Sequence, residues 1–421
     1  MKNKRTIGLV ATALTFLMLL ITIVARQGFN FDSCLLKPPD EKRLNDATEP
    51  EYFSPDYSTA RRRFLNAAST AGTKVESFRN PHNGPRGNPL FTDVALVGSA
   101  DASRIIVLSS GTHGVEGFAG SAVQTGLLSE DISKRLPKDT AVLMIHAINP
   151  YGMAYLRRFN EDNVDLNRNF VIHSNPYPSN EGYKALADVI APTAFSSWDN
   201  FISQTRLLSF RFLNGENELR QAISGGQYDY PEGLFFGGRK EAWSNQTIRK
   251  VVKRYLNRAT RVVLVDVHTG LGPFAGAEII ISEQEDSPAS ARALSWWGEK
   301  VKNTVTGESI SVPISGPLKT AFVQMPPATE VTAVSLEFGT YPAIDVFHAL
   351  RNENWVHHHA EPNYPHAKEI KSCLLEAFRP DSERWKASVW RQGKEVMDQV
   401  IYQGELRSDA LRSSAGSQAY E

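Results

Sequence analysis

Ile105-Ile-Val-Leu-Ser-Ser-Gly-Thr-His113-Gly-Val-Glu116-Gly-Phe-Ala-Gly120 is the stretch of sequence that decides the fold. A β-branched apolar run, typical of a buried strand, breaks there into glycines and a His-x-x-Glu pair. Apolar runs also end in a polar residue at 261–268 and at 334–337. Open α/β sheets place their ligand sites at the carboxyl ends of the strands. The repeated placement therefore predicts a functional site at that edge of a sheet.

Four residues in these stretches suit a catalytic metal site, namely His113, Glu116, His268 and Glu337. Each one alone is better explained by hydrogen-bonded packing at a strand end, and a single His-x-x-Glu is a weak signal. Their shared placement favours the functional interpretation. Two imidazoles and a carboxylate, with one position left free, are the ligand set of a catalytic zinc ion, which makes a bound water nucleophilic near neutral pH.

Apolar β-branched runs that alternate with helical segments predict an α/β fold, with a mainly parallel sheet covered by helices on both faces. Helical character is expected at 58–71, 118–128 and 291–303. Strands are expected at 94–97, 104–109, 140–146, 261–268, 277–282 and 332–337.

The motifs between residues 105 and 340, taken in order, resemble the zinc carboxypeptidase superfamily, most closely an uncharacterised bacterial branch of unknown function. Besides the residues above, the resemblance includes Asn149-Pro-Tyr-Gly152 and Asp165-Leu-Asn167-Arg168. It implies a mixed eight-stranded sheet. It also implies one zinc ion per chain, held by His113, Glu116 and His268.

Catalytic roles also follow from the resemblance. Glu337 matches the general base, which takes a proton from the attacking water and passes it to the leaving amine. Arg157 or Arg158 matches the arginine that stabilises the oxyanion, and we favour Arg158.

Binding roles complete the set implied by the resemblance. Asn167 and Arg168 match the pair that clamps a substrate carboxylate, for which a planar guanidinium is suited. Asp165 matches the acid that orients a zinc-binding imidazole, here that of His113.

One departure from the family pattern concerns a tyrosine. The digestive enzymes place a phenol over the end of the substrate, but no tyrosine occurs between His268 and Glu337. The glycine-rich stretch 225–238, which contains Tyr228 and Tyr230, could supply a replacement, or it could be a loop held by buried aromatic rings. The hydrolytic centre is complete without the phenol, but cleavage at the end of a peptide is less well supported.

Three functional hypotheses result. The first is a zinc hydrolase of an amide bond near a free carboxylate, acting like a carboxypeptidase on peptides. The second keeps the metal site and changes the substrate to an N-acyl amino acid. The third is a catalytically silent binding domain on a membrane anchor. A serine hydrolase is disfavoured because the chain has no Gly-x-Ser-x-Gly motif.

Composition sets wider limits. With 421 residues and 41% hydrophobic content, the chain can form a large folded core. Lys and Arg together number 46, as do Asp and Glu, which argues against a nucleic-acid partner held by bulk electrostatics.

The N-terminus has the pattern of a membrane helix. Residues 7–25 are 19 residues without a charge, and three basic residues precede them. As a helix they would nearly cross a hydrocarbon core of ~30 Å. We predict an uncleaved signal anchor over 1–26 rather than a signal peptide, because 22–27 offers a poor cleavage site. The basic flank places the following domain outside the cytoplasm, in the periplasm of a two-membrane bacterium, or secreted if the segment is cleaved.

The rest of the chain divides into a tether over 27–55, one catalytic domain over 56–405 with a mostly helical insertion at 175–258, and a disordered tail over 406–421. The two cysteines, Cys34 and Cys373, either pair in an oxidising compartment or remain free thiols.

We predict that residues 1–26 anchor the domain on the outer side of the cytoplasmic membrane. Reporters that are active on only one side of the membrane, fused after Tyr52, should report the outer side. A cytoplasmic signal would contradict the orientation, and a mature protein that begins near Arg26 would contradict the anchor.

Overall fold

The computed structural model describes residues 36–39, 52–194, 196–325, 328 and 330–417. The membrane helix predicted at 7–25 lies outside these residues, as does most of the predicted tether. In the described part of the chain, no helix is both long and apolar enough to cross a membrane.

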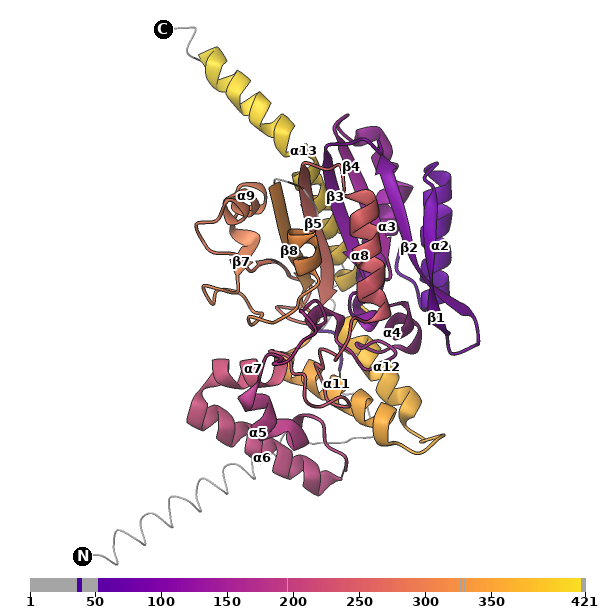
Figure 1. The fold of residues 1–421 in the computed structure, drawn as a ribbon, viewed down its shortest axis with the longest axis vertical. Helices are drawn as coiled ribbons and strands as arrows, with labels where there is room; N and C mark the ends of the chain where they lie inside the picture. Colours follow the sequence, from indigo (N-terminus) through magenta and orange to yellow (C-terminus); the bar gives the residue numbers. More distant parts are fainter. Residues whose placement is uncertain (1–35, 40–51, 195, 326–327, 329, 418–421) are drawn as a thin grey trace, which may run out of the picture.

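The core of the molecule is an eight-stranded sheet with the strand order β1-β2-β4-β3-β5-β8-β6-β7 (Figure 1). Its strands are β1 (Val75–Asn83), β2 (Pro89–Gly98), β3 (Arg104–Ser110), β4 (Thr140–His146), β5 (Arg261–Thr269), β6 (Ala277–Ile281), β7 (Val301–Asn303) and β8 (Glu330–Phe338).

The sheet is mixed and eight-stranded, as the resemblance implies, but it is less parallel than the apolar runs predict. β4, β3, β5 and β8 are parallel, but β1 pairs with β2, β2 with β4 and β6 with β8 in the antiparallel direction. β1 and β2 are joined by the short turn 84–88, and a connection of that length can only join antiparallel strands. The expectation of a mainly parallel sheet therefore holds for the centre and not for the sheet as a whole.

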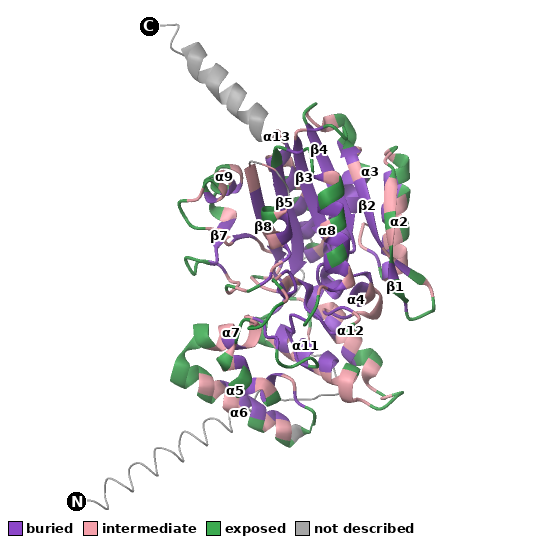
Figure 2. Ribbon diagram, viewed as in Figure 1, coloured by how far each residue is buried: buried purple, intermediate pink, exposed green. Residues whose placement is uncertain are grey.

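Helices cover both faces of the sheet, whose central strands are buried (Figure 2). Alternate side chains of each central strand enter different cores. In β3, Ile106 and Leu108 face one core while Ile105 and Val107 face the other. The first core is covered by α2 (Tyr57–Thr70), α3 (Gly117–Ser129), α9 (Pro288–Trp297) and α13 (Glu383–Ser417), and the second by α8 (Trp243–Tyr255) and α10 (Lys319–Gln324).

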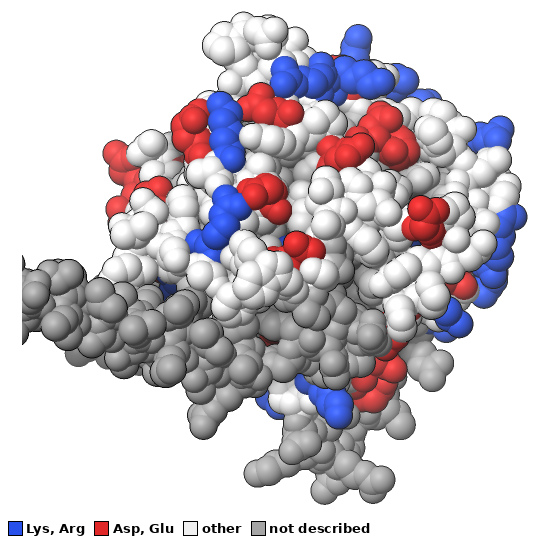
Figure 3. Space-filling model, turned by 90° about the horizontal axis from the view of Figure 1, so that it is seen from below, with Lys and Arg blue, Asp and Glu red and all other residues white. Residues whose placement is uncertain are grey.

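A helical lobe lies below the sheet in Figure 1, and it has its own apolar cluster. The lobe consists of α5 (Glu181–Ile190), α6 (Ser197–Asn214), α7 (Glu216–Ser224), α11 (Ala343–His359) and α12 (Ala367–Phe378). Acidic and basic side chains are interspersed over the face seen from below in Figure 3.

Short helical elements lie next to the carboxyl ends of the strands. They include α4 (Pro150–Tyr155) and the 3₁₀ turns η1 (Gly114–Glu116) and η3 (Leu166–Arg168). Two further 3₁₀ turns, η2 (Ile132–Arg135) and η4 (Gly298–Lys300), lie elsewhere.

Several elements differ from the sequence-based expectation. β1 and β7 were not expected, and the helix expected at 291–303 ends at Trp297, before β7. Residues 175–258 contain the helices α5, α6, α7 and α8, and α8 packs on the sheet and not in the lobe. α13 continues to Ser417, through most of the segment predicted to be disordered. Cys373, in α12, is disulfide-bonded, and Cys34, the only other cysteine of the chain, lies outside the described residues.

Candidate metal centre

Three strand ends bring the candidate residues together. His113 directly follows β3, while His268 and Glu337 are register partners on the neighbouring parallel strands β5 and β8. Parallel strands end at the same edge of a sheet, so their last residues are adjacent in space. The strand-end placement seen in the sequence therefore corresponds to one site.

A close backbone contact fixes the turn that presents His113 and Glu116. A Cβ added to Gly114 would lie only 2.1 Å from the carbonyl carbon of Gly152, so η1 packs directly on α4. The Asn149 side chain accepts a hydrogen bond from Gly152 N at 2.8 Å and caps α4. The Asn-Pro-x-Gly motif thus forms a support for the turn that carries His113 and Glu116.

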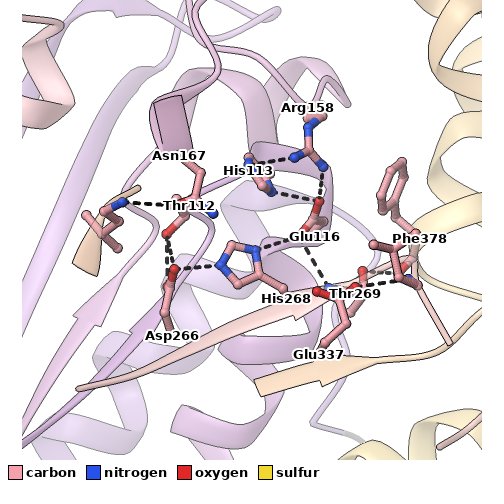
Figure 4. A network of polar contacts seen from close by, with 12 residues as sticks. Thr112, His113, Glu116, Arg158, Asn167, Asp266, His268, Thr269, Glu337 and Phe378 are labelled. Carbon is pink, nitrogen blue, oxygen red and sulfur yellow. Dashed lines mark hydrogen bonds and ion pairs between the residues drawn. The ribbon is translucent and has the colours of Figure 1, made fainter. Parts of the chain in front are cut away.

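His113, Glu116 and His268 form the candidate metal site. All three are buried, and one ligand atom from each lies within 4.8 Å of the others. Nδ1 of His113 is 2.8 Å from Oε1 of Glu116, and Nδ1 of His268 is 3.0 Å from Oε2 of the same carboxylate (Figure 4). Ligands about 2.0–2.1 Å from one zinc ion stand about 3.4 Å apart. The donor set is one that zinc takes, and its atoms are close enough together to share one ion.

Each imidazole has a carboxylate behind it. Nε2 of His113 lies 3.0 Å from Asp165, and Nε2 of His268 lies 2.6 Å from Asp266. At His268, the carboxylate keeps the proton on Nε2 and leaves the Nδ1 lone pair for a metal, as second partners of metal-binding histidines generally do. Nε2 of His113 also lies 2.9 Å from Nη2 of Arg158. Asp165 was expected beside His113.

Asp266 was missed by the sequence interpretation. Its signal was the Asp-x-His pattern in β5, because residues two apart in a strand point to the same side. Asp266 is itself fixed by the hydroxyl of Ser109, which donates to it at 2.7 Å, and by that of Thr112 at 2.9 Å.

The two adjacent arginines separate clearly. Arg157 points away from the metal site and forms a buried ion pair with Glu353 at 2.9 Å. Arg158 faces the site and donates to Glu116 at 2.8 Å and to Asp165 at 3.2 Å. Arg158 is therefore the arginine in position to act on a substrate.

The protonation equilibria of the two glutamates differ. Burial raises the pKa of the Glu116 carboxyl, but His113 and Arg158 outweigh burial and hold it well below its usual range. Burial, together with the charge of Glu116, raises the pKa of Glu337 to about 7. Glu337 accepts one hydrogen bond, from Leu271 N at 2.9 Å. Glu116 is thus suited to bind a cation, and Glu337 to accept and return a proton near neutral pH.

Asn167 and Arg168 also reach the cavity, and both retain donors. The side-chain oxygen of Asn167 accepts a hydrogen bond from Leu318 N at 2.8 Å, which turns its amide nitrogen to other partners. Arg168 donates to the carbonyl oxygens of Asn167 and Ser224. Its buried Nε has no partner among the described residues. An unpaired buried donor beside the metal site suits an anionic ligand.

These residues line a single cavity of about 590 Å³. The sheet edge supplies its polar wall, and the helical lobe supplies an aliphatic wall made of Leu207, Leu208, Leu219, Ile223, Ile344, Val346 and Leu350.

The glycine-rich stretch 225–238 does not supply a tyrosine to this cavity. Tyr228 is buried and donates to the carbonyl oxygen of Arg168 at 2.6 Å, and Tyr230 does not line the cavity. The stretch instead places the ring of Phe235 against the guanidinium groups of Arg158 and Arg168, at 5.3 Å and 5.8 Å. Of the two interpretations of this stretch, the loop held by buried aromatic rings fits the structure.

Residues 53–392 match the family described as "Protein of unknown function (DUF2817)". The chain belongs to this family. No curated protein sequence matches the chain significantly.

Solved structures with a similar fold include the carboxypeptidase A from Helicoverpa armigera, with 14% identity, a TM-score of 0.43, and coverage of 84% of this chain and 77% of that one. Bovine thrombin-activatable fibrinolysis inhibitor has 11% identity and a TM-score of 0.41 over 82% of this chain and 99% of that chain. The succinylglutamate desuccinylase from Chromobacterium violaceum has 15% identity and a TM-score of 0.34 over 78% and 76%. Values this low transfer neither an activity nor a substrate.

We predict that metal binding depends on Asp266 as well as on the three ligands. His113→Ala and His268→Ala should lose most of the bound zinc, measured by elemental analysis. Asp266→Asn should retain a site but weaken zinc affinity about 10- to 100-fold, because His268 loses the partner that orients its ring.

Asp93→Asn is the matched control for Asp266→Asn. Asp93 is also buried, but it pairs with Arg61 away from the cavity. Undiminished zinc in both histidine variants would exclude the assignment of the ligands. Equal affinities in Asp266→Asn and Asp93→Asn would exclude the orienting role of Asp266.

Proposed function

We propose that the chain is a zinc-dependent hydrolase that cleaves an amide bond close to a free carboxylate of its substrate. The observation that supports this most is one cavity that contains a His-Glu-His metal site, a glutamate with a raised pKa and an arginine with an unpaired buried donor. The three features correspond to the three needs of the reaction, which are an activated water, a proton carrier and a group that positions the substrate.

His113, Glu116 and His268 would hold the zinc ion. When bound, the ion supplies Lewis acidity, which polarises the amide carbonyl and lowers the pKa of a water molecule. Glu337 takes the proton from the attacking water and delivers it to the leaving nitrogen. Burial raises its pKa toward neutrality, which suits both steps, because the group must exist in either protonation state near neutral pH.

Arg158 stabilises the developing oxyanion in this proposal. It lies at the cavity wall against the Glu116 and Asp165 carboxylates and stacks near Phe235. A fixed guanidinium in a partly dry site stabilises a new negative charge more than one in water does.

Asn167 and Arg168 are the reason for proposing that the substrate has a free carboxylate. The guanidinium of Arg168 is buried, and its Nε has no partner among the described residues, so it can still donate to a carboxylate. The substrate would be a peptide with a free carboxyl end, which makes the enzyme a carboxypeptidase.

The alternative substrate is an N-acyl amino acid. The aliphatic wall from α6, α7 and α11 favours it, because an apolar acyl chain could lie there. A silent binding domain is less favoured, since the ligands and Glu337 are all present. We further propose that residues 1–26 anchor this domain outside the cytoplasm.

Glu337→Gln should keep its zinc and lose most of its activity, by about 100-fold or more in kcat, because it removes the proton carrier and not a ligand. Zinc content and turnover of peptides and N-acyl amino acids would be measured together. Glu353→Gln is the control, as Glu353 is also buried but pairs with Arg157 outside the cavity. Parent-like turnover in Glu337→Gln would rule out the general base.

Arg168→Ala should lower kcat/KM strongly on substrates with a free carboxylate and far less on the same substrates amidated at that end. The clamp contributes binding energy and also positions the carbonyl, so both KM and kcat should change. Asn167→Ala should have the same effect more mildly, because it removes a neutral donor.

Arg168→Lys should restore only part of the loss, since an ammonium lacks the planar pair of donors. Equal cleavage of free and amidated substrates by the parent enzyme would contradict the clamp and indicate an amidase that cleaves within chains.

A further inference from the structure

Lys319 is a cation of the cavity that the chemistry above does not use. It lies at the start of α10 and lines the same cavity as His268 and Glu337. Among the residues that the structure describes, its ammonium group has no hydrogen bond or ion pair. The lining arginines Arg158, Arg168, Arg211 and Arg220 each have one.

The backbone places Lys319 beside the proposed carboxylate clamp. Leu318 N donates to the side chain of Asn167 at 2.8 Å, and Phe170 N donates to Gly316 O at 3.0 Å. A Cβ on Gly316 would lie 2.6 Å from the carbonyl oxygen of Arg168. The loop before Lys319 is therefore in direct contact with the segment that holds Asn167 and Arg168.

Hydroxyl groups line the same cavity as Lys319. Ser335 stands two residues before Glu337 in β8, so both side chains lie on the same face of the strand, and both line the cavity. Ser335 is the register partner of Asp266, whose charge acts on Lys319. Ser282, which also lines the cavity, accepts a hydrogen bond from Thr304 at 2.6 Å and keeps its own proton to donate.

The electrostatics around Lys319 leave its charge only partly compensated. Burial lowers the pKa of the ammonium to about 8, although Glu283 and Asp266 act in the opposite direction. It is therefore still largely protonated at neutral pH. A partly buried charge without a partner in contact is costly, and a bound anion would remove that cost.

We propose that Lys319, with the hydroxyls of Ser282 and Ser335, binds a second carboxylate of the substrate. The residue whose terminal carboxylate Arg168 clamps is then an acidic amino acid, aspartate or glutamate. This inference rests on the proposed function and names its substrate class. Ser335 lies about 7 Å along β8 from Glu337, a distance in the range of an acidic side chain extending from a residue held at the metal centre.

Binding to a variant that does not turn over tests the site directly. The zinc-loaded Glu337→Gln protein would be titrated calorimetrically with N-acetyl-L-glutamate and with its neutral isostere N-acetyl-L-glutamine. We expect the glutamate compound to bind at least about tenfold more tightly. Adding Lys319→Met should bring the two affinities to within about twofold of each other, and adding Lys319→Glu should reverse the order.

Lys300→Met is the matched control, because Lys300 is partly buried but pairs with Glu395 outside the cavity. It should preserve the tenfold difference. Equal binding of the two compounds to the Glu337→Gln protein, or no binding of either, would overturn the second carboxylate site. So would a preference for glutamate that survives Lys319→Met.

Activity of the parent enzyme separates this inference from the proposed function. Selective binding by a protein that hydrolyses no peptide or N-acyl amino acid would leave the Lys319 site standing and reject the hydrolase. Hydrolysis without any preference for glutamate over glutamine would support the hydrolase and reject the Lys319 site.

Discussion

The arrangement of the site depends on the buried carboxylate of Glu116. It has almost no contact with solvent, and it is surrounded by His113, His268 and Arg158. An ionised carboxylate in that position requires positive or hydrogen-bonding partners, because burial of an unpaired charge is strongly unfavourable. A metal ion would satisfy the same requirement. The proposed chemistry and the stability of this region therefore both depend on compensation of the Glu116 charge by its neighbours.

That balance explains why so many polar groups are buried around the site. Each group that faces Glu116 needs a partner of its own, and Asp165 and Asp266 supply these for the two imidazoles. Asp266 is in turn held by hydroxyls of Ser109 and Thr112. The network ends at neutral hydroxyl and backbone groups, so no charged member lacks a partner at contact distance.

The sequence predicted the parts of the site that belong to strand ends. His268 and Glu337 stand at corresponding positions of parallel neighbours, and continuous β-branched apolar runs indicate such strands directly. Asp266 was visible in the same pattern but was interpreted as part of the strand. Strands β1 and β7 were missed, since β1 is mostly exposed and has no apolar alternation, and β7 has only three residues.

Residues outside regular elements were harder to place. Arg157 and Arg158 are identical in type and adjacent in sequence, and only tertiary contacts with Glu353 and Glu116 distinguish them. The position of Tyr228, which supports the backbone of Arg168, depends on a loop whose path no local pattern specifies. Contacts of this kind join segments far apart in the chain, so propensity and periodicity contain no information about them.

The groups proposed to react and the group proposed to select the substrate lie in different kinds of segment. The reacting groups lie at strand ends, and Lys319 lies in a connection between strands. The groups proposed to react stand at the ends of β3, β5 and β8, where the sheet fixes them rigidly. Lys319 lies in the connection between β7 and β8, which contacts the clamp segment through Leu318 and Gly316. Connections change more freely than strands, because fewer buried contacts constrain them. A change at position 319 could therefore alter which substrate the cavity accepts and leave the metal-binding strand ends intact.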